Sequence, residues 1–201
     1  MTLKKYSRPI AKRRYKNLFI VSTEGCKTEP IYFSFLDRLV DSIHIEVLPT
    51  RRGHCTPSDV FERALKKAKS KGPLMKGDEV WLVIDRDNRP AETIEKVINS
   101  CNREKYNFAV SNPKFELWLL LHFEFPPART INTSQDCTER LRKYISNYEK
   151  SHFDVSKIIS NVNKAIERAE GNYSDFDPLS DSTGTNVHLL VKKIMESGTK
   201  P

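Results

Sequence analysis

The sequence of 201 residues contains no long apolar run and no secretory signal pattern. Its longest nearly pure apolar stretch, 117–123, is interrupted by His122 and falls short of the roughly 20 residues that a membrane-spanning helix needs. The basic amino-terminal segment leads into a strand-like run instead of the apolar core of a signal peptide. These absences predict a cytoplasmic protein without a membrane partner.

Cysteine is scarce, with four residues at positions 26, 55, 101 and 137 and no C-x-x-C pair. Without such a pair or clustered histidines the sequence offers no zinc-binding pattern, and free buried thiols are expected. The seven glycines form neither a Walker A loop nor a G-x-G-x-x-G turn. The chain therefore has no nucleotide-hydrolysing motor of its own.

The net charge of +8 comes mostly from one amino-terminal arm, residues 1–16. Its basic residues all precede the first acidic residue, Glu24, and arms of this kind release counterions from a phosphate backbone. The arm predicts binding to RNA or DNA, while a solvated tail that only aids solubility is the open alternative. The candidate nucleic-acid-binding residues are Lys4, Lys5, Arg8, Lys12, Arg13, Arg14 and Lys16.

Strand-like and helix-like runs alternate through residues 17–123, the predicted core. Strands that alternate with helices of about 10 to 15 residues are typical of α/β folds, in which right-handed crossovers place helices on both faces of a parallel sheet. We therefore predict an α/β fold with a parallel sheet of about four strands. The predicted strands are 17–22, 43–48, 79–85 and 106–111, and the predicted helices are 28–41, 57–69, 90–104 and 113–123.

The last part of the chain, residues 124–201, has a different character. Helical periodicity at 135–148, 155–170 and 186–195, with no strand-like run between, predicts an all-helical extension packed on the core. A proline-containing linker, 124–134, precedes it, and a long segment of turn-forming residues, 171–184, interrupts it. A loop of that length is either mobile or functional.

Acidic residues follow the predicted strands at their carboxyl ends, where open α/β sheets place ligand sites. Glu24 follows the first strand, and Asp85 and Asp87 end the third. They converge if the strand order is 2-1-3-4, which makes the first and third strands neighbours. Residues i and i+2 of a strand point the same way, so Asp85 and Asp87 are expected to share one hard cation, Mg²⁺ or Mn²⁺. The alternative is a pair of surface acids that cap the next helix.

Further polar residues near this edge extend the candidate site. Glu29 and Glu116 are candidates for holding a second cation or the attacking water, and Lys27 for stabilising the scissile phosphate. Asn112 is expected to cap the helix 113–123 on the face that carries Glu116, and Ser111 precedes it as a supporting residue. For Lys27 the plain alternative is a solvated loop lysine.

Four runs spread over nearly the whole chain resemble the RloB-like family of bacterial defence proteins: FIVSTEGCKTEPIYFSFL, VWLVIDRDN, SNPKFELWLLLHF and STGTNVHLL. That family is similar to Toprim domains, in which a Glu after the first strand and a D-x-D after a later strand bind magnesium for phosphodiester chemistry. By this resemblance Glu24, Asp85 and Asp87 are catalytic metal ligands. Glu29 matches a second Glu of related nucleases, whereas Ser111 and Glu116, with four residues between them, depart from their Ser-x-Glu pattern.

The resemblance also implies a partner, because RloB-like proteins are typically encoded beside an RloA-like ATPase in anti-phage loci. We therefore predict a Mg²⁺-dependent Toprim-like nuclease that cleaves RNA, with tRNA as one candidate, or DNA. The alternative is a non-catalytic nucleic-acid-binding or adaptor subunit of an ATPase-containing defence complex. A phosphatase of the haloacid-dehalogenase type is disfavoured, because its D-x-D follows the first strand. The sequence predicts no oligomeric state.

Overall fold

The computed structural model describes residues 16–50, 56–127, 130–131 and 133–198. Of the basic arm only Lys16 lies inside these ranges, and it is exposed. The other arm residues proposed to bind nucleic acid, together with Cys55, lie outside the described residues. Across the described ranges no helix is long and apolar enough to cross a membrane.

Five strands form one sheet in the order β2-β1-β3-β4-β5. The first four are parallel, which confirms the predicted α/β fold and the neighbouring first and third strands. The short fifth strand runs antiparallel to β4 and comes from the segment that was expected to be a loop before the final helix. The strands are β1 (Asn17–Thr23), β2 (Ile43–Leu48), β3 (Glu79–Asp85), β4 (Asn107–Asn112) and β5 (Gly184–Thr185).

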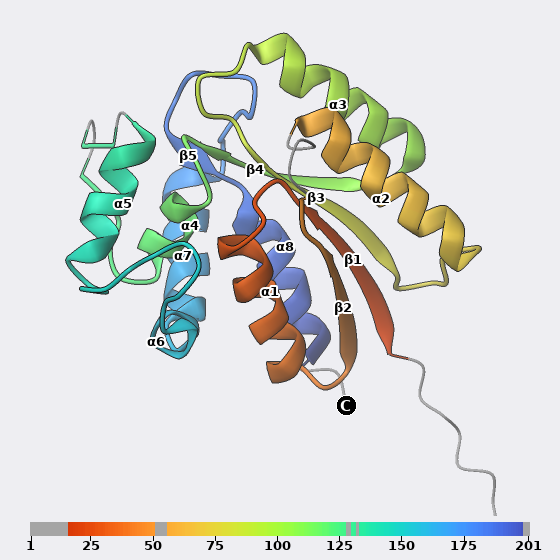
Figure 1. Ribbon diagram of the computed structural model, residues 1–201, viewed down its shortest axis with the longest axis horizontal. Coiled ribbons are helices and arrows are strands. Elements are labelled where there is room, and N and C mark those ends of the chain that lie inside the picture. Colours follow the sequence, from red (N-terminus) through yellow and green to blue (C-terminus); the bar gives the residue numbers. More distant parts are fainter. Residues whose placement is uncertain (1–15, 51–55, 128–129, 132, 199–201) are drawn as a thin grey trace, which may run out of the picture.

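Helices cover both faces of this sheet (Figure 1), with α2 and α3 on one face and α1 and α8 on the other. Alternate residues of β1 explain the two layers, because Ile20 belongs to the core under α2 and α3, whereas Phe19 and Val21 belong to the core under α1 and α8. The helices are α1 (Thr28–Leu39), α2 (Pro57–Lys71), α3 (Ala91–Glu104), α4 (Glu116–Leu121), α5 (Ser134–Arg142), α6 (Val155–Ile159), α7 (Val162–Tyr173) and α8 (Val187–Gly198).

Local sequence signals start several helices as expected. Thr56 and Asp59 form a reciprocal capping box at the start of α2, and Thr133 and Asp136 form another at α5. Thr28 was predicted as a cap but lies inside α1, whose N-cap position, Lys27, makes no side-chain capping bond. That end of α1 is instead tied by the side chain of Glu29, as described below.

The helix expected over 113–123 begins later than predicted, at Glu116. Asn112 does not cap it, because Asn112 pairs with β5 as the last residue of β4 and is followed by a cis peptide bond to Pro113. Asn112 donates through its side chain to the carbonyl of Ser182 over 2.9 Å. All six residues of α4 are buried, so this short helix is a core element.

The carboxyl-terminal extension joins the core that lies under α1 and α8. α5 and α7 contact α4, and α6 contacts α1. Leu141, Tyr148 and Ile166 belong to the same buried cluster as Trp118 of α4 and Phe19 of β1. The extension thus completes the hydrophobic core on one side of the sheet, and it is not all helical because it supplies β5.

Candidate acidic site at the carboxyl edge of the sheet

Four acidic residues from separate segments approach one another at the carboxyl ends of β1 and β3. Glu24 directly follows β1, and its backbone N–H donates to Val83 of β3 over 3.0 Å. Asp85 is the last residue of β3, Glu29 lies in the first turn of α1, and Glu116 opens α4. Asp85 feels the charges of the other three, so the parallel sheet brings these acids within electrostatic range.

Asp85 is the centre of this group. Its Oδ1 accepts a hydrogen bond from the backbone N–H of Phe115 over 2.8 Å, which fixes the carboxylate toward the β4–α4 turn. Burial raises the pKa of Asp85 well above its usual range, and the charges of Glu29, Glu24 and Glu116 raise it further. Asp85 is therefore a carboxylate that would gain from a nearby cation.

Glu24 has a cation of its own, Arg89. Arg89 Nη2 lies 2.5 Å from Glu24 Oε1, and Arg89 Nη1 lies 3.3 Å from Glu24 Oε2. The backbone N–H of Asp85 also donates to Glu24 Oε2 over 3.3 Å. Burial nevertheless raises the pKa of Glu24, because desolvation outweighs the opposing effect of the guanidinium.

Glu29 folds back over the β1–α1 turn and is only 5% exposed. Its Oε1 accepts a hydrogen bond from the backbone N–H of Gly25 over 2.9 Å. A Cβ at residue 25 would lie 2.0 Å from Glu29 Oε2, so the turn needs glycine for the carboxylate to approach this closely. Burial raises the pKa of Glu29 to about 7, and the charge of Glu116 adds to the shift.

Glu116 is 2% exposed, and two of its partners come from the extension. Tyr148 donates its hydroxyl to Glu116 Oε1 over 3.1 Å, and Lys150 Nζ lies 3.6 Å from the same oxygen. Lys114 Nζ lies 4.0 Å from Glu116 Oε2 and donates to Thr138 Oγ1 over 2.7 Å. The extension thus brings an ammonium group to the acids.

Asp87 has a different setting from Asp85. β3 ends at Asp85, and Asp87 has a positive φ of 42°, so the alternation expected to align the two carboxylates does not extend to it. Asp87 is exposed and accepts a hydrogen bond from Ser134 Oγ over 2.9 Å. Its charge still acts on Glu24 and raises the pKa of that carboxyl.

Lys27 and Ser111, the remaining candidate residues, differ in their surroundings. Lys27 is exposed at the start of α1. Ser111 shares a hydrogen bond of 2.8 Å with Thr185 Oγ1, and its carbonyl accepts from the N–H of Arg86 over 2.8 Å. Ser111 therefore connects β4 to β5 and to the turn after β3, and it pairs with Asp85 in the register of β3 and β4.

Within the ranges that the structure describes, no group of three or more His, Cys, Asp or Glu side chains is arranged to hold a metal ion. Mg²⁺ commonly binds through one or two carboxylates, with water and substrate phosphates completing its shell. The oxygen donors of Asp85, Glu24 and Glu29 suit such an ion. Burial raises the pKa of all three carboxyls, and the opposing effects of Arg89 on Glu24 and of Lys150 on Glu29 do not cancel it. The donor chemistry therefore fits a hard divalent cation.

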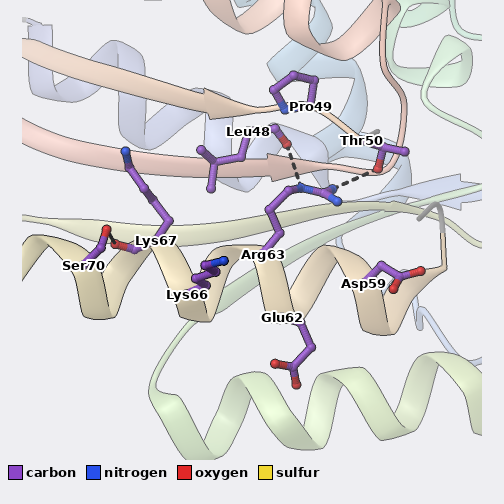
Figure 2. Close-up of a pocket in the computed structure, with 9 residues that line it drawn as sticks. All are labelled: Leu48, Pro49, Thr50, Asp59, Glu62, Arg63, Lys66, Lys67 and Ser70. Carbon is purple, nitrogen blue, oxygen red and sulfur yellow. Dashed lines mark hydrogen bonds between the residues drawn. The ribbon is translucent and has the colours of Figure 1, made fainter. Parts of the chain in front are cut away.

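The described part of the molecule includes a small pocket and a larger groove. A polar pocket of about 270 Å³ lies next to the acids and is lined by residues that include Arg86, Asp87 and Arg89. A larger groove of about 660 Å³ runs between β2 and α2 (Figure 2). In it Arg63 reaches the carbonyl of Leu48 and the hydroxyl of Thr50, and none of its lining residues belongs to the acidic group.

Sequence reasoning missed the basic partners of the acids. Arg89 lies within the run DRDNRP, two residues after Asp87, so its position close to the acids in the sequence could have identified it as a candidate partner. Lys150 carried none, because it lies 34 positions after Glu116 and reaches it only through the packing of the extension. Arg86, between the two aspartates, also went unnoticed and is 3% exposed.

Comparison with known proteins gives a family match. No curated protein and no solved structure matches the chain. A family described as RloB-like protein matches residues 19–194, a span that takes in the sheet, the acidic residues and most of the extension. The chain belongs to the RloB-like family.

Proposed function

We propose that this RloB-like protein is a metal-dependent nuclease that hydrolyses phosphodiester bonds of RNA or DNA as the effector of an anti-phage system. The observation that carries the proposal is the approach of Glu24, Glu29 and Glu116 to Asp85 at the carboxyl edge of a parallel sheet. Burying like charges together costs stability, so such an arrangement favours a functional role for the acids.

Asp85, Glu24 and Glu29 are the residues proposed to hold Mg²⁺ or Mn²⁺, with the exposed Asp87 proposed as a further ligand. A bound divalent cation would supply Lewis-acid stabilisation of charge on the phosphate oxygens. Arg89 orients Glu24 through two hydrogen bonds, and the N–H of Phe115 orients Asp85. Lys150 lowers the electrostatic cost of the buried Glu116 and keeps a positive charge beside the group.

The test is cleavage of a tRNA pool and of a plasmid by the purified protein with Mg²⁺, Mn²⁺ or EDTA. Asp85→Asn and Glu24→Gln are expected to abolish metal-dependent products. Glu95→Gln is a matched control, since Glu95 is an exposed residue of α3. Metal-dependent cleavage that survives in the Asp85→Asn protein would contradict the assignment of the site.

A second candidate is a non-catalytic nucleic-acid-binding or adaptor subunit that works with an RloA-like ATPase. The observation that favours it is the ion pairing of Glu24 with Arg89 and of Glu116 with Lys150, which gives these acids partners without a metal. This candidate expects salt-sensitive binding to nucleic acid and no cleavage, even with the ATPase present. Gel-shift assays over a range of salt concentrations, run beside the cleavage assay, separate the two.

A further inference from the structure

A small polar pocket lies beside the acids, and both acidic and basic side chains line it. It has a volume of about 270 Å³ and opens between the turn after β3 and the turn after β4. Arg89 belongs both to this pocket and to the acidic site, because its guanidinium also holds Glu24. The polar residues that line the pocket are Arg86, Asp87, Asn88, Arg89, Asn112 and Asp181.

Arg86 is the unusual member of this lining. It is only 3% exposed, and buried cations in proteins are nearly always paired. Its Nη2 donates to Asp181 Oδ1 over 2.9 Å and to the carbonyl of Leu179 over 3.4 Å, but its Nε is buried and has no hydrogen-bond partner among the residues that the structure describes. A guanidinium presents its donors in a planar fork that matches an oxyanion, so Arg86 has a donor to spare for one.

The anion that Arg86 now holds comes from the surface. The side chain of Asp181 is fully exposed, whereas that of Arg86 is 4% exposed. Exposed carboxylates gain little from one ion pair, because water and salt compete for them. Asp181 is therefore an anion that another oxyanion is able to replace.

We propose that this pocket binds a phosphate group of the nucleic-acid substrate, with Arg86 as the main donor and Asp181 as the internal anion that the phosphate displaces. Asn112, which also lines the pocket, donates to the carbonyl of Ser182 over 2.9 Å. The segment that carries Asp181 and Ser182 therefore occupies donors of both Arg86 and Asn112. Movement of this segment away from the pocket frees the donors of both Arg86 and Asn112. The assignment rests on the proposed nuclease function, since it names where the substrate backbone sits relative to Glu24 and Asp85.

The test follows the side-chain Nε–H signal of Arg86 in ¹H–¹⁵N spectra of the metal-free protein, identified by its loss in Arg86→Lys. Inorganic phosphate is added in EDTA and compared with sodium chloride at equal ionic strength. We expect a saturable shift with phosphate that chloride does not produce. Asp181→Asn is expected to bind phosphate about two- to fivefold more tightly, because a competing ion pair of modest strength is gone. Asp175→Asn, an exposed acid of the same segment, is expected to bind like the wild type.

A second arm replaces phosphate with a short single-stranded oligonucleotide or with a nucleoside that carries no phosphate. We expect the oligonucleotide to shift the same signal and the nucleoside to leave it unchanged. A response to inorganic phosphate alone would overturn the assignment to substrate, as would an Arg86 signal that behaves alike in phosphate and chloride. If the wild type and Asp181→Asn bind phosphate with equal affinity, the ion pair does not compete with phosphate and only holds the loop in place. That result would overturn the role of Asp181 as the displaced anion. Because no metal is present and no cleavage is measured, these results stand apart from the test of nuclease activity.

Discussion

Glu29 is predicted to destabilise the metal-free protein, and replacing Glu29 with Gln should therefore stabilise it. Its side chain is 5% exposed, and its pKa is raised from 4.5 to about 7. At about 1.4 kcal/mol per pKa unit, keeping this carboxylate ionised in the folded state costs about 3 kcal/mol. Gln has the same shape, and its carbonyl oxygen keeps the hydrogen bond from the Gly25 N–H.

The pH dependence gives this prediction a signature. Between pH 4.5 and pH 7 the folded state holds a proton on Glu29 that the unfolded state has lost, so the contribution of this residue to stability falls as pH rises. The advantage of Glu29→Gln should be absent below pH 4.5 and should reach about 3 kcal/mol above pH 7.

Urea unfolding in EDTA, at intervals from pH 4.5 to pH 8.5, measures this difference as the shift in the free energy of unfolding. Glu95→Gln, on the exposed face of α3, serves as the control and should change stability by less than about 0.5 kcal/mol at every pH. A Glu29→Gln protein that is no more stable at pH 8, or whose advantage does not vary with pH, would refute the reasoning. Added Mg²⁺ should narrow the gap by stabilising the wild type.

Three further predictions concern the partners and the core. His122 is buried, and burial lowers its pKa to about 3. Its contribution to stability is therefore lost as pH falls from about 6.5 toward 3. In acid denaturation His122→Gln should lose less free energy of unfolding than the wild type over that range. Arg89→Gln leaves Glu24 buried without its cation and should cost about 1 to 3 kcal/mol in urea unfolding at pH 7, a loss that Glu24→Gln in the same chain should partly restore. Leu141→Ala, at a fully buried position of α5, should cost about 2 to 5 kcal/mol and shift one single thermal transition, whereas two separate transitions would show that the extension unfolds independently.

The sheet could be predicted because its strands carry their own signals. The runs around Ile20 and Leu82 are apolar and bounded by loops, as expected for strands buried on both faces. Neighbouring positions of the first and third strands then followed from the need to bring Glu24 and Asp85 together, and the register of β1 with β3 agrees. Local patterning was sufficient here because each element buries residues at its own period.

The rest of the site depends on contacts between distant segments, which local patterns do not encode. β5 has only two residues, including Gly184, and forms because Asn112 and Ser111 offer an unpaired edge. Asn112 looked like a helix cap from its position before Pro113, but strand pairing takes priority over capping there. For Asp87 the strand alternation does not apply, since β3 ends two residues earlier, at Asp85, and Asp87 has a positive φ.

The position of α8 has a consequence for synthesis of the protein on the ribosome. This helix, near the carboxyl terminus, contacts β2 and β4 and covers the sheet face that carries Phe19 and Trp81. The acids at 24, 29, 85 and 116 leave the ribosome well before Lys150 does, and α8 follows later still. Until α8 has been synthesised, a nascent chain therefore leaves this apolar face of the sheet uncovered, and until residue 150 has been made it lacks the ammonium group that pairs with Glu116.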